Sequence, residues 1–270
     1  MWRAPLRRQL PLRNLPPPRG NAPQWRASIK VYCSIGYMDN STPELVALYT
    51  LFVSIVIVCF VGVLLLIRKA HPPALPASAL FLVALLSSTY AAAASGVLKH
   101  WEVLPPPPAI IMVLLVCLNC CLCFCTELGL QLSSLPLSLL VGTQSFRIAV
   151  EVWLHCGKEL RVVPPQLAWG GRNFDVATGV LAAVLGVWSL RTRPPDVLLW
   201  IYNSCGLAVL INVVVTAVLS LPTRMQHFHP SSEFIVEPPF VWLPTWLVQC
   251  AFAGQCAGWT RRTARPLLSD

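Results

Sequence analysis

The stretch "LVALYTLFVSIVIVCFVGVLLLI", residues 45–67, contains no charged residue and is followed directly by Arg68 and Lys69. A transmembrane α-helix needs about 20 consecutive apolar residues, and this stretch is longer. In a bilayer, every backbone N–H and C=O group must find its hydrogen-bond partner inside the segment, which a helix achieves and an isolated strand does not. The stretch therefore predicts a membrane-spanning helix.

The same pattern recurs along the chain and predicts six further spans. They cover residues 74–98, 109–126, about 137–156, about 174–190, 197–221 and about 240–259. These windows show no period-two alternation of the kind that marks a transmembrane β-barrel. The sequence therefore predicts an all-α fold, a polytopic membrane helical bundle of about seven transmembrane helices, within a transmembrane domain over residues 43–260.

The composition supports lipid as the main solvent of this chain. Hydrophobic residues make up 56% of the 270 residues and charged residues only 11%, whereas soluble domains carry about 25% charged residues. So few charges could not cover a water-exposed surface. The net charge of +9 is compatible with anionic lipid headgroups. No aromatic-interleaved basic face follows, so we expect the lipid bilayer as a partner and no nucleic acid.

The two ends of the chain differ from this domain. Residues 1–42 are basic and rich in Pro and Arg, and the first acidic residue is Asp39. The prolines would break an amphipathic targeting helix, so we expect a disordered segment or a spurious extension upstream of a true start at Met38. Residues 261–270 are predicted to be a short basic tail.

The fourth window contains the polar stretch "QSFRIAVEVWLHC", residues 144–156. A helix turns by about 100° per residue, which places Gln144, Glu151 and His155 within about 80° of Arg147 on one face. A charge at the bilayer centre costs about 2.5–3.5 kcal/mol on insertion scales. Arg147 and Glu151 have i,i+4 spacing, so pairing would reduce that cost. We predict an inward-facing polar stripe with an Arg147–Glu151 ion pair.

The following loop, "QLAWGGRNFDVATG" at residues 166–179, supplies candidate partners for that stripe. Asn173 suits a helix N-cap and Asp175 suits the first helical turn. Arg172, beside the free N–H groups of the helix start, could help to hold an anion. The predicted ligand-binding set is Gln144, Arg147, Glu151, His155, Arg172, Asn173 and Asp175.

Other polar and small residues in the apolar windows predict helix packing. Asn203 and Asn212 are nine residues apart and point to opposite sides of one helix, so one at most faces the same cavity and the other bonds a neighbouring helix. Asn119 is expected to bond across helices too. The small residues from Gly179 to Gly186 predict a close helix–helix contact.

The run "CLNCCLCFC", residues 117–125, places Cys117, Cys121 and Cys125 on one helical face. Thiolates suit a soft ion such as Cu(I). Thiolates buried in lipid are costly, however, and zinc sites normally gather four ligands with turns. Free cysteine behaves as a small apolar side chain. We therefore predict no metal and no other cofactor.

Four stretches together carry a resemblance: "LLVGTQSFRIAVEVWLH", "VPPQLAWGGRNFDVATG", "INVVVTAVLSLPT" and "FVWLPTWLVQ". The chain resembles, over roughly residues 43–259, a family of uncharacterised bacterial multi-pass integral membrane proteins with no assigned activity. That family often has Glu before the Gly-Arg-Asn-Phe-Asp segment, where this chain has Gly170 and Gly171. The resemblance implies the topology and a location in the bacterial plasma membrane, and it implies no mechanism.

Three functions remain open from the sequence. In the first, a central polar pocket binds or translocates a small solute or a proton; Arg147 supplies a fixed charge, Glu151 a counter-ion or proton acceptor, and His155 a group that titrates near neutral pH. The second is a membrane-embedded enzyme that uses Glu151 and His155 on a lipid-soluble substrate, although no nucleophile motif or phosphate loop accompanies them. The third is a structural membrane subunit without a ligand. The oligomeric state stays open.

Overall fold

The computed structural model describes residues 43–103 and 105–263, the side chains as far as residue 260. These residues form helices and connecting turns, and no strand occurs in the described ranges. The predicted N-terminal segment, residues 1–42 with the alternative start at Met38, lies outside them, as does residue 264 onward in the predicted tail. The last helix continues to Thr263, beyond the predicted domain end at residue 260.

The described chain contains longer α-helices joined by single turns of 3₁₀ helix. The α-helices are α2 (Pro43–Ala70), α3 (Leu75–Ala94), α4 (Pro107–Cys125), α5 (Glu127–Ser134), α6 (Leu137–Gly142), α7 (Phe146–Glu159), α8 (Asp175–Trp188), α9 (Asp196–Val218) and α10 (Val248–Thr263). The short turns are η2 (Pro72–Ala74), η3 (Val97–Lys99), η4 (Thr143–Ser145), η5 (Pro165–Leu167) and η6 (Glu233–Val236), and a π-helical turn, η7 (Leu243–Leu247), leads into α10.

Five segments in the described ranges are long and apolar enough to cross a membrane. They are Pro43–Ala70, Pro72–Ala94, Pro107–Cys125, Leu137–Glu159 and Asp196–Val218, and each coincides with a predicted window. The window at 174–190 forms α8, which has 14 residues, fewer than the about 20 needed to span a bilayer. The window at 240–259 forms the π turn and α10, which has 16 residues. The described ranges therefore contain five candidate spans, and the predicted number of about seven is not confirmed.

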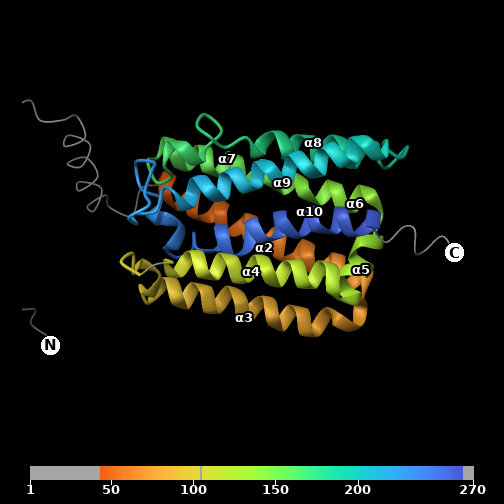
Figure 1. The fold of residues 1–270 in the computed structure, drawn as a ribbon, viewed down its shortest axis with the longest axis horizontal. Helices are drawn as coiled ribbons and strands as arrows, with labels where there is room; N and C mark the ends of the chain where they lie inside the picture. The colour runs from red at the N-terminus through yellow and green to blue at the C-terminus, as the bar shows by residue number, and fades with distance from the viewer. Residues whose placement is uncertain (1–42, 104, 264–270) are drawn as a thin grey trace, which may run out of the picture. The chain divides into compact units, whose positions relative to one another are not determined.

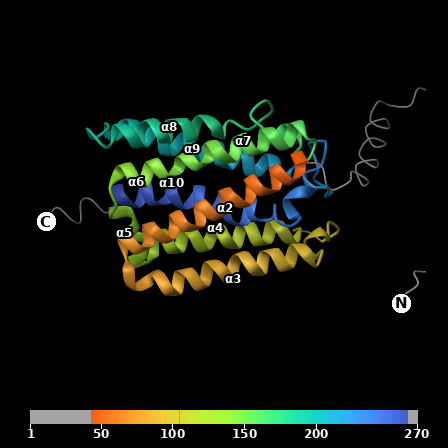
Figure 2. The same cartoon turned by 180° about the vertical axis from the view of Figure 1, so that it is seen from behind.

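Helix α10 lies in the middle of the bundle formed by residues 43–263. Figures 1 and 2 show it in blue between α9 and α4, with α3 at one edge and α8 at the other. Helix α10 contacts α4, α5, α6 and α9, whereas α8 packs against α6, α7 and α9. The central helix buries Gln249, Gln255 and Thr260. Asn119 of α4 donates to Gln249 Oε1 at 2.7 Å, which confirms the predicted bond across helices.

Large apolar side chains occupy both the interior and the outer surface. Trp153 of α7 is fully buried beside Phe52 of α2, with 4.7 Å between ring centroids, and Phe240 joins them at 5.2 Å from Trp153. On the outer surface, Val58, Leu80 and many similar side chains are exposed. An apolar surface this extensive needs a cover other than water.

Glycines allow the backbone of α8 to pack directly against the backbones of α6 and α7. A Cβ atom placed on Gly186 would lie 2.7 Å from the Cα atom of Gly142, and one placed on Gly179 would lie 2.9 Å from the backbone nitrogen of Ile148. Such separations are too short for carbon in van der Waals contact. The small residues predicted to pack closely therefore do so. The contact at Gly179 brings the first half of α8 against α7.

A Gly186→Ala substitution is expected to destabilise the protein by about 1–3 kcal/mol, because the opposing atoms are backbone and cannot rotate away. The matched control is Gly62→Ala in α2, where nothing lies within 4 Å of the added Cβ and alanine favours the helix. Thermal unfolding of the detergent-purified variants measures the difference. Equal melting temperatures for the two variants would contradict the close contact.

Candidate functional site

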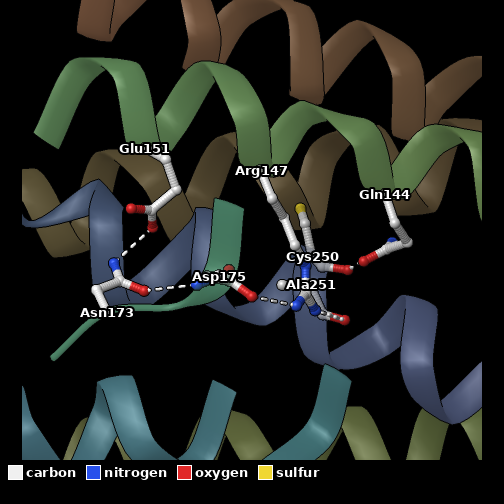
Figure 3. Close-up of polar contacts among 7 residues, drawn as sticks. All are labelled: Gln144, Arg147, Glu151, Asn173, Asp175, Cys250 and Ala251. Carbon is white, nitrogen blue, oxygen red and sulfur yellow. Dashed lines mark hydrogen bonds and ion pairs between the residues drawn. The ribbon is translucent and has the colours of Figure 1, made fainter. Parts of the chain in front are cut away.

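Arg147 of α7 is at the centre of a buried ionic cluster. Its side chain is 1% exposed, its Nη1 lies 2.7 Å from Asp175 Oδ1, and its Nη2 donates to the backbone carbonyl of Ala251 at 3.2 Å (Figure 3). The predicted pairing with Glu151 is therefore wrong: the ion-pair partner is Asp175. The short α7–α8 contact at Gly179 explains this, because it carries the first residue of α8 to the guanidinium group.

Glu151, one turn further along α7, has a different environment. It is 2% exposed, and its Oε1 accepts a hydrogen bond from Asn173 Nδ2 at 2.5 Å. Its Oε2 has no hydrogen-bond partner in the described structure, and neither does Arg147 Nε. The great majority of buried polar atoms in proteins have a hydrogen-bond partner, so each exception needs an explanation.

Asn173 connects the cluster to the start of α8. Its Oδ1 accepts the backbone N–H of Asp175 at 2.9 Å, and its Nδ2 also donates to the carbonyl of Leu167 at 3.0 Å. The side chain thus satisfies a free N–H group at the helix start, as an N-cap does. The helix begins at Asp175, which puts Asn173 one position before the assigned cap. Asn173 fixes the positions of Asp175 and Glu151 at the same time.

The loop before Asn173 depends on a close backbone approach at Gly171. A Cβ atom there would collide with the carbonyl oxygen of Pro165 and lie 2.8 Å from the Cα atom of Gln166. The N–H of Gly171 closes the turn by donating to Ala168 O at 2.8 Å. Glycine at this position therefore lets the chain turn back into α8.

Gln144 reaches the same central helix from the 3₁₀ turn before α7. Its Nε2 donates to the carbonyl of Cys250 at 3.5 Å (Figure 3), and its Oε1 has no partner in the described structure. A Cβ atom on Gly254 would collide with the Gln144 amide, so this glycine makes room for the side chain. Gln144 and Arg147 together attach α7 to the backbone of α10.

His155 and Arg172 lie apart from this cluster. The His155 ring stacks on Trp169, with 4.4 Å between centroids and 25° between planes. Arg172 is exposed, with its guanidinium carbon 4.5 Å from the centre of the Phe228 ring. Its backbone carbonyl accepts from Asn212 Nδ2 at 2.7 Å. Five of the seven predicted residues are therefore brought together on α7, η4 and the start of α8.

A cavity of about 100 Å³ opens beside the cluster. Arg147, Glu151, Asn173 and Asp175 form its polar wall. The opposite walls are apolar and come from α4, α9 and the π turn with the start of α10. A water molecule needs about 10–15 Å³ of such volume, so the space is large enough for several waters or one small ligand. π-Helical turns occur frequently at functional sites.

A second cavity of about 30 Å³ lies beside the Gln144 turn. Gln144, Tyr202 and Asn203 line it together with Gly254 and Gly258. Asn203 faces this smaller cavity and Asn212 donates to the carbonyl of Arg172, so the two asparagines of α9 point apart as predicted. Neither lines the larger cavity, and Asn212 bonds a loop and not the predicted neighbouring helix. The contribution of α10 was not foreseen. The glycines at 254 and 258, four residues apart in "GQCAG", were the available signal.

The cysteines of α4 differ in their exposure. Cys117, Cys121 and Cys125 are exposed, while Cys123 is buried. Among residues 43–103 and 105–263, no group of three or more His, Cys, Asp or Glu side chains could hold a metal ion.

Residues 105–253 match a protein family described as a domain of unknown function, DUF8737. The chain belongs to this family. The DUF8737 segment includes the whole ionic cluster and all of its side-chain contacts, but it is narrower than the region over which the sequence resemblance was drawn. No curated protein and no solved structure matches the chain. The match agrees with a family of uncharacterised proteins and leaves its activity to be inferred from the site.

Proposed function

We propose that this DUF8737 protein is an integral membrane protein whose larger cavity binds or translocates a small solute or a proton. The bacterial plasma membrane, implied by the sequence resemblance, is the proposed location. The lipid bilayer is the proposed partner of its outer surface.

The membrane assignment is supported by the distribution of apolar residues. Five helices have the length and composition of spans, and large apolar side chains such as Leu80 and Val197 are exposed, at 73% and 70%. Buried polar side chains instead occur in the interior, and they include the ionic cluster and Gln249, Gln255 and Thr260 of the central helix. This distribution is the reverse of that in a water-soluble protein and suits a hydrocarbon solvent.

The observation that carries the solute or proton proposal is the unpartnered oxygen of Glu151 at the wall of a cavity. A purely structural cluster would satisfy its charged atoms internally, because an unsatisfied charge in a low-dielectric interior is costly. Here Glu151 Oε2 and Arg147 Nε have no protein partner, although both residues line space large enough for a ligand. Intramembrane ionisable groups commonly mark ion and substrate pathways.

The enzyme alternative is less well supported by the geometry. General acid–base catalysis would require Glu151 and His155 to reach one substrate. The His155 ring stacks on Trp169 and does not line the cavity that Glu151 lines. The Glu151→Gln experiment distinguishes the structural-subunit alternative from the proposed function.

Glu151→Gln tests the proposal, with Glu127→Gln on exposed α5 as the matched control. We expect both variants to fold in amounts close to wild type, because glutamine still accepts from Asn173. In proteoliposomes with an internal pH-sensitive dye, Glu151→Gln should lower proton flux by about 100-fold, the scale of a positioned proton-transfer group. A hydrophobic carbodiimide, which reacts with a protonated carboxyl group, should modify Glu151 in the wild-type protein if Glu151 carries the proton, as mass spectrometry would show.

The structural-subunit alternative predicts a different result. Wild-type protein would then show no proton flux and would bind none of the small amine, alcohol and carboxylate probes, and the variant would differ from wild type only in thermal stability. That pattern would refute the proposed function.

A further inference from the structure

We propose that the larger cavity binds a small monovalent organic cation, such as an alkylammonium ion, with its charged group on Glu151 Oε2. This inference rests on the proposed function and specifies the substrate class of that site. It follows from the charges, hydrogen bonds and shape of the cavity.

The charges at the cavity wall do not balance. One cation, Arg147, and two carboxylates, Glu151 and Asp175, line it, and no lysine or histidine is among the described residues that do. Arg147 is paired with Asp175 at 2.7 Å, so Glu151 is left without a counter-ion. One positive charge in the cavity would make the cluster neutral, which matters in an interior that screens charge poorly.

The free hydrogen-bonding atom has the chemistry to receive that charge. Glu151 Oε1 accepts from Asn173, while Oε2 has no partner. A carboxylate oxygen accepts hydrogen bonds and cannot donate them when ionised, so it selects for a donor such as an ammonium group. Such charge-assisted hydrogen bonds are among the strongest that proteins form.

Other ligand classes fit this wall less well. An anion would meet two carboxylates and an arginine whose charge is already neutralised by Asp175. A divalent metal ion needs several oxygen ligands, and the described residues contain no group of three side chains that could supply them. An organic monocation can form its charge-assisted hydrogen bond with a single strong acceptor, which Glu151 provides.

The remaining walls indicate that the cation has an apolar body. Leu210 and Val214 of α9, Leu243 and Leu247 of the π turn, and Met112 of α4 line the cavity opposite the cluster. The volume of about 100 Å³ is smaller than the roughly 150 Å³ of an apolar cavity that accepts benzene. A ligand of about four to six non-hydrogen atoms, with the size of n-butylammonium, matches this space.

The test measures binding of n-butylammonium to the full-length protein in lipid nanodiscs by isothermal titration calorimetry. Two probes of similar size serve as comparisons: neutral 1-butanol and anionic butyrate. We expect n-butylammonium to bind more tightly than either. Glu151→Gln should weaken its binding by at least about tenfold, because the charge-assisted hydrogen bond is lost, whereas Glu127→Gln should leave binding unchanged.

A second variant tests the shape of the cavity independently of the charge of Glu151. Val214→Phe fills part of the cavity and retains Glu151, so it should also weaken n-butylammonium binding. Because Val214 belongs to a different helix, this variant keeps the test decisive if Glu151→Gln folds poorly.

Each other outcome overturns the inference in a distinguishable way. Equal binding of 1-butanol and n-butylammonium, or preference for butyrate, would refute the cation assignment and leave a solute cavity in place. No binding of any probe, with proton flux still dependent on Glu151, would refute the organic cation and retain the proton function. No binding and no dependence of proton flux on Glu151 would refute the inference and the proposed function together.

Discussion

Replacing Arg147 with methionine is expected to destabilise the protein by about 3–5 kcal/mol, the cost of leaving a buried charge without its partner. Methionine has similar length and remains compatible with the apolar surroundings. Asp175 would lose its 2.7 Å ion pair and the carbonyl of Ala251 would lose a donor. The melting temperature of detergent-purified protein, followed by size-exclusion chromatography after heating, measures the loss.

Two further variants separate the ion pair from the arginine side chain itself. Adding Asp175→Asn to Arg147→Met should recover much of the lost stability, because it removes the orphaned charge; a double-mutant cycle gives the coupling between the two sites. Arg193→Met breaks an exposed pair with Asp196, whose atoms lie 2.6 Å apart, and should cost less than about 1 kcal/mol. If Arg147→Met lowered the stability no more than Arg193→Met, the buried ion pair would not stabilise the packing of α8 against α7.

Trp153→Ala is the second substitution with a large expected effect, about 3 kcal/mol or more, because it leaves a cavity where α2 meets α7. The indole is fully buried between Phe52 and Phe240, and its Nε1 donates to the carbonyl of Leu48 at 3.0 Å. In the proposed bilayer, the loss is of packing and of this hydrogen bond, since apolar burial between helices gains little over hydrocarbon. Thermal unfolding provides the measurement.

Trp153→Phe and Trp188→Ala are the matched variants. The first keeps an aromatic ring and removes the hydrogen bond, so it should cost about 1 kcal/mol. The second removes an indole that is 42% exposed and should change stability by about 0.5 kcal/mol or less. A Trp153→Ala melting temperature equal to that of Trp188→Ala would contradict the role of Trp153 as a core contact.

The long apolar helices could be predicted from the sequence because their signal is local. Charge-free stretches bounded by Arg, Lys or Pro located α2, α3, α4 and α9 to within a few residues. The bounds of α8 were predicted to within two residues, but its 14 residues are fewer than the about 20 that a span needs. The π turn before α10 was missed, because hydropathy does not distinguish a π-helical turn from an α-helical one. Helix α5 was missed, since its eight residues, "ELGLQLSS", carry no apolar run.

The sequence predicted most of the residues that form the candidate site, but not which of them contact one another. Helical periodicity placed Gln144, Arg147 and Glu151 on one face. The preference for Asn at a helix N-cap and for Asp in the first helical turn added Asn173 and Asp175. Periodicity within one helix cannot reveal which neighbouring helix approaches that face. The approach of α8 through Gly179 decided that Arg147 pairs with Asp175. The backbone carbonyls of α10 that accept from Gln144 and Arg147 have no sequence signature at all.

The location of the Arg147 ion pair has a consequence for biogenesis. Arg147 and Asp175 belong to consecutive helices, 28 residues apart, whereas the Ala251 carbonyl lies 104 residues beyond Arg147. During synthesis, α7 and α8 emerge before α10, so the ion pair between them can form first. Helix α10 is made later and docks onto a preformed charged pair. Ribosome-stalled chains ending between α8 and α10 should therefore already contain the paired α7–α8 hairpin.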